Sequence, residues 1–128
     1  MISGKDIEEI LITALSRLIT ASSIYVEDDI PDGNVTAQRI TLHVKEIKTQ
    51  PIFKKCFVEV NWCVPDIGEA PDAAGLKAVE HQMVDFEYTG EYDGTAYRYG
   101  VESIRTLKSE LKCHYVNTRL LFEILNVM

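Results

Sequence analysis

The side chains that could bind a metal ion or act as nucleophiles are three cysteines and three histidines: Cys56, Cys63, Cys113, His43, His81 and His114. Metal sites in short chains usually contain a local pair of ligands such as CxxC, HxxxH or HExxH, because two nearby ligands already form a chelate. The sequence contains none of these pairs. Cys56 and Cys63 lie an odd distance apart in an alternating segment, which directs their side chains to opposite faces. No metal site is predicted.

The candidates for covalent chemistry lack the necessary geometry. Cys113 and His114 are a potential thiol–imidazole pair, but neighbours in a strand point to opposite faces and do not share a proton. Ser22 and Ser23 are not framed by the GxSxG turn of serine hydrolases. We therefore predict Cys113 as a small core residue, His114 as a surface or boundary residue, and a protein with no catalytic residue that is not an enzyme.

Two loops have compositions that suggest ion or phosphate binding. Four carboxylates lie close together in the first loop: Glu27, Asp28, Asp29 and Asp32. No glutamate closes a twelve-residue calcium loop after them, so a solvated turn is favoured and weak cation binding is the alternative. Residues 90–94 contain two glycines but neither the GxGxxG nor the GK[ST] pattern that binds phosphate. The sequence predicts no cofactor.

The chain is acidic, with a net charge of -7 over 128 residues. A protein that binds nucleic acid or an anionic membrane generally needs a concentrated positive face, so neither partner is predicted. The exception is a group of lysines on a predicted hairpin tip: Lys45, Lys48, Lys54 and Lys55. Such a tip often only keeps a hairpin soluble, and the functional alternative is a basic finger that contacts an acidic partner.

Tyrosines around Arg98 form a second candidate contact surface: Tyr88, Tyr92, Tyr97 and Tyr99. Tyrosine and arginine are favoured at protein interfaces, although strand alternation alone explains half of these tyrosines. From the two groups we select five candidate protein-contact residues: Lys48, Lys54, Lys55, Tyr97 and Tyr99.

A helix over residues 2–19 is the first of the elements that must position these residues. Its apolar side chains recur at helical spacing: Ile7, Ile10, Leu11, Ala14, Leu15, Leu18 and Ile19. Ser3 is the expected N-cap, and Asp6 adds negative charge at the positive end of the helix dipole.

Alternation of apolar and polar residues predicts strands over residues 39–47 and 56–63, which form an antiparallel pair joined by a polar turn at 48–55. A short β-prone run at 24–26 precedes them. A second helix is expected after its cap Asp72, with Leu76, Val79, Met83 and Val84 on one side. Further strands are expected around residues 86–88, 97–101 and 116–124.

This order of elements predicts a single domain over residues 1–128, of the α+β class, with a mostly antiparallel sheet and two helices packed on one face. The cysteine number is odd and no basic, apolar leader opens the sequence, so we expect reduced thiols in a cytoplasm. The longest apolar stretches are far shorter than the about 20 residues that a membrane span needs.

Seven stretches combine into a pattern that covers nearly all of the chain: ISGKDIEEILITALSRLI, IYVEDDIPDGN, RITLHVKEI, CFVEVNWCVPD, DAAGLKAVEHQMVDF, YRYGVESIRTL and CHYVNTRLLFEIL. In element order and hydrophobic pattern they resemble the tail-terminator and tail-completion proteins of long-tailed bacteriophages. Related small head–tail joining proteins share much of the same pattern.

The resemblance implies a structural phage or prophage protein that self-associates into a ring, often hexameric, at the end of the tail tube. It would contact other tail or connector proteins through its hairpin and loops, in the host cytoplasm during assembly and then in the virion tail. Two other classes stay open. One is a small monomeric binding module or regulator, and the other is an enzyme in which the histidines and cysteines converge in one cleft.

Overall fold

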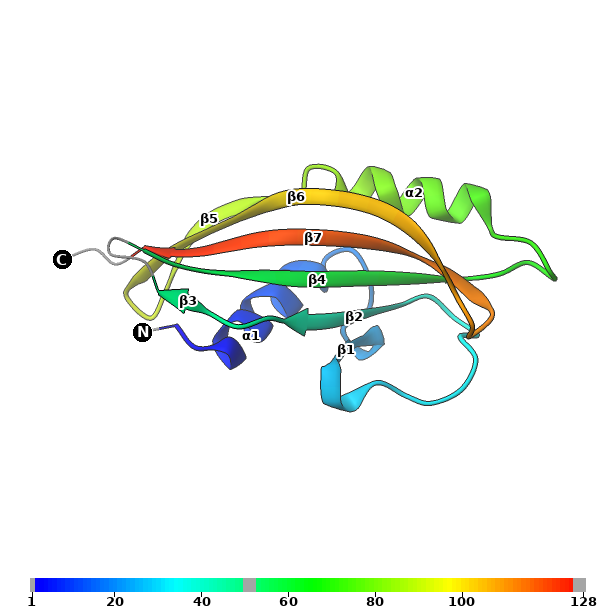
Figure 1. Ribbon diagram of the computed structural model, residues 1–128, viewed down its shortest axis with the longest axis horizontal. Helices are drawn as coiled ribbons and strands as arrows, with labels where there is room; N and C mark the ends of the chain where they lie inside the picture. The colour runs from blue at the N-terminus through cyan, green and yellow to red at the C-terminus, as the bar shows by residue number, and fades with distance from the viewer. Residues whose placement is uncertain (1, 50–52, 126–128) are drawn as a thin grey trace.

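The computed structural model describes residues 2–49 and 53–125, which fold around one large curved sheet (Figure 1). Its strands are β1 (Ile24–Val26), β2 (Arg39–Val44), β3 (Lys48–Thr49), β4 (Phe53–Pro65), β5 (Tyr88–Tyr92), β6 (Thr95–Ser109) and β7 (Cys113–Leu125). The helices are α1 (Gly4–Leu15) and α2 (Ala73–Met83), and the 3-10 turns η1 (Ala21–Ser23) and η2 (Glu27–Asp29) flank β1. The predicted α+β class, dominated by a sheet, is confirmed.

Within the described ranges the seven strands make one sheet in the order β1-β2-β4-β7-β6-β5, with β3 added beside β4. β1 and β2 run parallel, whereas each of the other neighbouring pairs is antiparallel, so the sheet is mixed. A parallel pair needs a long crossover connection, and the irregular segment between Val26 and Arg39 supplies it. The predicted antiparallel pairing of the segments 39–47 and 56–63 is confirmed by β2 and β4.

Helix α1 begins at the predicted cap. The Ser3 hydroxyl accepts a hydrogen bond from the Asp6 amide at 3.2 Å, and the Asp6 carboxylate accepts one from the Ser3 amide at 2.9 Å, which together form a capping box. The helix ends at Leu15, about one turn before its predicted end. There the Leu18 amide bonds to the Leu15 carbonyl three residues back, which tightens the last turn out of the α geometry.

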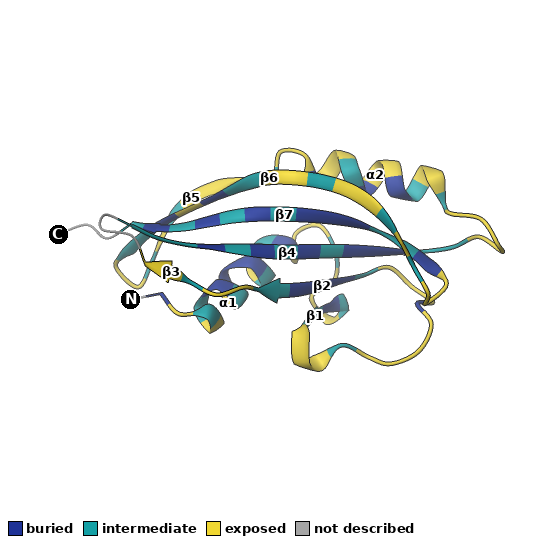
Figure 2. Ribbon diagram, viewed as in Figure 1, coloured by how far each residue is buried: buried dark blue, intermediate teal, exposed yellow. Residues whose placement is uncertain are grey.

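The core is one apolar cluster to which both helices and the sheet contribute, and most even-numbered residues of β4 and β7 are buried in it (Figure 2). β4 and β7 contribute Cys56, Val58, Val60, Trp62, Val64, Val116, Leu120, Phe122 and Ile124. The other strands add Ile24, Ile40, Leu42, Tyr97 and Tyr99, and the helices add Ile7, Ile10, Leu11, Leu15, Leu76, Val79 and Met83. Both helices therefore pack into one continuous apolar cluster. The buried Trp62 indole N–H donates to the Gln38 side-chain oxygen at 3.0 Å.

Three further predictions about local structure were wrong in detail. The strand predicted over residues 39–47 ends at Val44, and part of the polar turn predicted over 48–55 is strand, because β3 pairs with the start of β4. The centre of that turn, residues 50–52, lies outside the described residues. Val84, expected on the buried side of α2, follows the last helical residue and is 56% exposed.

The alternation along β7 can be tested with two adjacent leucines. Leu120 is fully buried, whereas Leu121 lies on the opposite face and is half-buried. We expect Leu120→Ala to lower the free energy of unfolding by about 2–5 kcal/mol and Leu121→Ala by less than half as much, because only the first leaves a cavity in the core. Urea unfolding followed by Trp62 fluorescence measures both. Equal losses would contradict the assigned faces.

Candidate functional site

The outer edge of β6 is largely without a strand partner. β5 pairs only with residues 95–99 of β6, which continues to Ser109. Among the residues that the structure describes, no strand pairs with the outer side of residues 100–109. Helix α2 contacts this stretch through the Thr106 hydroxyl, which donates to the Glu80 carboxylate at 2.7 Å. A long edge with free backbone N–H and C=O groups is a template for pairing with another chain.

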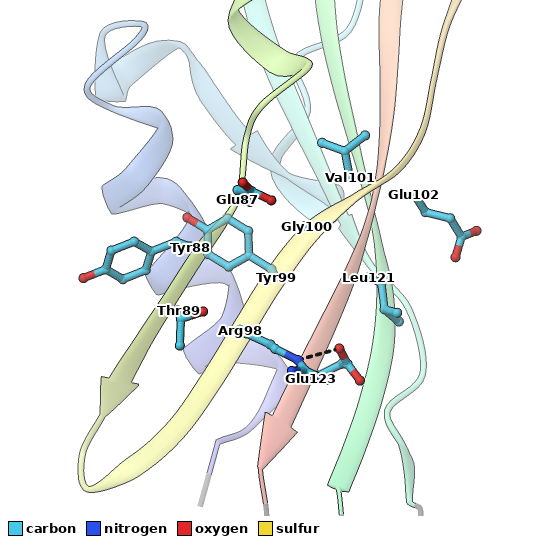
Figure 3. Close-up of a pocket in the computed structure, with 10 residues that line it drawn as sticks. All are labelled: Glu87, Tyr88, Thr89, Arg98, Tyr99, Gly100, Val101, Glu102, Leu121 and Glu123. Carbon is cyan, nitrogen blue, oxygen red and sulfur yellow. Dashed lines mark hydrogen bonds and ion pairs between the residues drawn. The ribbon is translucent and has the colours of Figure 1, made fainter.

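A groove of about 590 Å³ opens where β5 begins beside β6 (Figure 3). We call it the edge groove, and its lining residues are Glu87, Tyr88, Thr89, Arg98, Tyr99, Gly100, Val101, Glu102, Leu121 and Glu123. Gly100 contributes no side chain, and a register shift between Val101 and Ser103 bends β6 at the same place. The groove therefore adjoins the first unpaired residues of the β6 edge.

Charged side chains border the edge groove. The Arg98 guanidinium donates to the Glu123 carboxylate at 2.9 Å, and this hydrogen bond raises the pKa of Arg98 (Figure 3). Glu87 and Glu102 are exposed and form no hydrogen bond to the other residues drawn in the groove. This arrangement suits recognition of a partner by charge and shape.

Tyr97 and Tyr99 lie in the core instead of on the surface. Each is only 6% exposed, and their rings stack on Phe122 with centroid distances of 5.4 and 5.8 Å. Burial raises the pKa of Tyr99 to about 12. The expectation that these two tyrosines form an exposed adhesive patch is corrected, because they share the face of β6 that packs against the core. Tyr88, opposite Tyr99, is 55% exposed and lines the edge groove.

The predicted lysine group is divided by the sheet. Lys48 and Lys55 are directly opposite each other in the β3–β4 pair and therefore share a face. Lys54 is opposite Thr49 and belongs to the other face, so it does not join them. A pocket of about 390 Å³ lies at the first face, and we call it the basic pocket. Its lining is Lys45, Glu46, Lys48, Lys55, Cys56, Phe57, Glu59 and Arg119.

Arg119 forms one wall of the basic pocket. Its guanidinium carbon lies 4.1 Å from the centre of the Phe57 ring, a cation–π geometry that fixes the side chain. The Arg119 Nε is 3.7 Å from a carboxylate oxygen of Glu59 and 3.7 Å from one of Glu102, so its charge is shared between two long contacts. The pocket carries four cationic and two anionic side chains, an excess of positive charge in an acidic protein.

The three cysteines are buried and reduced. Cys56 belongs to the main core and Cys63 to a second, smaller cluster, which confirms that they face opposite sides of the sheet. Cys113 joins Cys63 and Val35 in that cluster, a proximity that the sequence spacing did not reveal. Cys113 is a small core residue, as predicted.

The three histidines do not converge on the cysteines. The His114 Nδ1 lies 2.7 Å from a carboxylate oxygen of Asp66 and the His43 Nδ1 3.6 Å from one of Glu27, while His81 is exposed on α2. Among residues 2–49 and 53–125, no three histidine, cysteine or acidic side chains are arranged to hold a metal ion. No helix in the same ranges is both long and apolar enough to cross a membrane.

Comparison of the chain with known protein families and with curated protein sequences gives no match. Seven chains of solved structures do match. One of them, whose name states no function, superposes with a TM-score of 0.54 over 94% of this chain and 97% of its own length, at 13% sequence identity. This similarity shows that the two chains share a fold over nearly their whole lengths.

The burial of the thiols predicts their reactivity. Burial raises the pKa of both Cys56 and Cys63 to about 11, so at pH 8 about one such thiol in a thousand is ionised. We expect a disulfide reagent at pH 8 to modify essentially no thiol in the folded protein and all three after denaturation in urea. Rapid modification of any thiol in the folded protein would contradict this burial.

Proposed function

We propose that this chain is a structural protein of a phage or prophage tail, a tail terminator or related head–tail joining component, that acts through contacts between copies in a ring. The resemblance of its element order and hydrophobic pattern to those proteins supports the assignment. The single observation that carries the self-association is the unpaired edge of β6 over residues 100–109. We further propose that the sheet is mostly antiparallel and that both helices pack on one of its faces. The opposite face is then available for contacts with other protein chains.

The side chains of the β6 edge suit regulated pairing. Val101, Ile104 and Leu107 are partly buried and spaced along the unpaired stretch. They alternate with exposed charges of both signs, Glu102, Arg105 and Lys108. Mixed charges on an edge strand disfavour pairing with most other strands, but they allow pairing with a strand that carries complementary charges. An edge of this composition fits a protein that associates with one kind of partner.

In this proposal the protein catalyses no reaction and needs no cofactor, because its function is to bind other protein chains through its surface. Its partners are further copies of itself and other tail or connector proteins. The competing interpretation is a small monomeric binding module or regulator. The two differ in oligomeric state, which can be measured directly.

The first test is the molar mass in solution, measured by light scattering after size exclusion over a wide range of concentrations. We expect a closed oligomer, hexameric if the resemblance holds, to be present throughout or to form as concentration rises. A monomer at every concentration would contradict self-association and favour the binding module.

Hydrogen exchange then tests which surface associates. We expect amides within residues 100–109 to be more protected in the oligomer than in the dilute monomer, because pairing occupies their free N–H groups. Residues 58–63 of β4 are the internal control, since β2 and β7 already pair with them on both sides and their protection should not change. An oligomer without added protection at 100–109 would assign the association to another surface.

A further inference from the structure

The basic pocket contains lysines that have no ion-pair partner in the described part of the chain. Lys45, Lys48 and Lys55 each line the pocket, and none of them forms a salt bridge there. Lys48 and Lys55 are also directly opposite each other across the β3–β4 pair. Like charges in that position repel, so the isolated protein has an unfavourable contact that a bound anion would relieve.

An acidic turn lies elsewhere on the same molecule. It consists of η2, Glu27–Asp29, together with Asp32, and all four carboxylate residues are exposed. Glu27 lies 3.6 Å from the His43 ring, and the other three form no salt bridge with the residues that the structure places. The turn follows β1, which pairs with residues 40–42 of β2. It is therefore a compact negative projection on the β1 side of the sheet (Figure 1).

The acidic turn and the lysines of the basic pocket form no ion pair with each other in the described ranges of one molecule. The pocket lies around Lys45 and β3, beyond the end of β2, whereas Glu27 of the turn contacts His43 within β2. Two complementary surfaces that are not paired with each other on one protomer fit a contact between protomers. When the two surfaces are different, repetition of the contact makes a ring if the rotation closes.

We propose that the basic pocket of one copy binds the acidic turn of a second copy. This inference rests on the proposed ring assembly and names the charged contact within it. Asp28 and Asp29 supply carboxylates to Lys45, Lys48 and Lys55, and Arg119 is held by Phe57 at the wall of the same pocket. A phosphate-bearing polymer is the other anion that such a pocket attracts, but the net charge of -7 opposes its approach.

Complementary charge exchange tests the contact. The variant K48E/K55E gives the pocket net negative charge, and D28K/D29K/D32K gives the turn net positive charge, because three lysines then stand beside Glu27. Each variant alone should associate at least roughly tenfold more weakly than the parent, because pocket and turn then repel. An equimolar mixture should recover assembly, because the negative pocket of the first variant accepts the positive turn of the second. Light scattering measures all three samples, and added salt should weaken the parent association.

The matched control is K5E/K77E, which makes the same change in net charge as K48E/K55E on exposed helix positions. It should assemble like the parent, and thermal unfolding should show that all variants remain folded, because exposed charges contribute little to stability. Lys54→Glu adds a second control, since Lys54 faces away from the pocket.

The outcomes separate the contact from the function. If the parent assembles and both charge variants assemble equally well, or if the mixture fails to recover, the contact is overturned while the ring remains. If the parent stays monomeric, both proposals are overturned. If instead the parent binds a DNA oligonucleotide that K48E/K55E does not bind, and mixing recovers nothing, the pocket is a phosphate site and the contact between copies is wrong.

Discussion

The pairing of β4 with β7 is the interaction on which the rest of the structure depends. The two strands are in register from Phe53 opposite Leu125 to Pro65 opposite Cys113, without a shift. Each also has another strand along its other side, β2 beside β4 and β6 beside β7. Most alternate residues of this pair enter the apolar cluster to which the helices also contribute. The register therefore decides which residues are buried, and it places Lys55 and Arg119 on the side of the basic pocket.

The opposite face of the same pair shows how the register is held. The Asn117 amide donates to the Asn61 side-chain oxygen at 2.7 Å and to the Glu59 carboxylate at 3.2 Å, beside the Arg119 contact with Phe57. A slip of one residue would bury these polar groups and expose the apolar ones, so this polar face helps to specify the register together with the core.

Local patterns made much of this fold predictable. Ser3 and Asp72 cap their helices as expected, because capping depends on neighbouring residues only. The parallel pairing of β1, the division of Lys54 from Lys55 and the burial of Tyr97 and Tyr99 were not foreseen. Alternation shows that residues share a face but not which face meets the core. It also does not reveal which strands are neighbours, so the proximity of Cys63 on β4 to Cys113 on β7 could not be predicted. For the candidate surfaces, the sequence identified the charges and the structure showed which of them lie on the same face.

The position of β7 has a consequence for biosynthesis. It is the last strand along the described chain, yet it lies between β4 and β6. During translation, β7 leaves the ribosome after β4 and β6. The β4–β7 and β6–β7 pairs can therefore form only after β7 has been synthesised. Truncated chains that lack this strand keep their inner edges open and do not acquire the native surface. The topology thus makes synthesis of β7 a condition for closing the sheet, and the edge of β6 that faces β7 stays open until then.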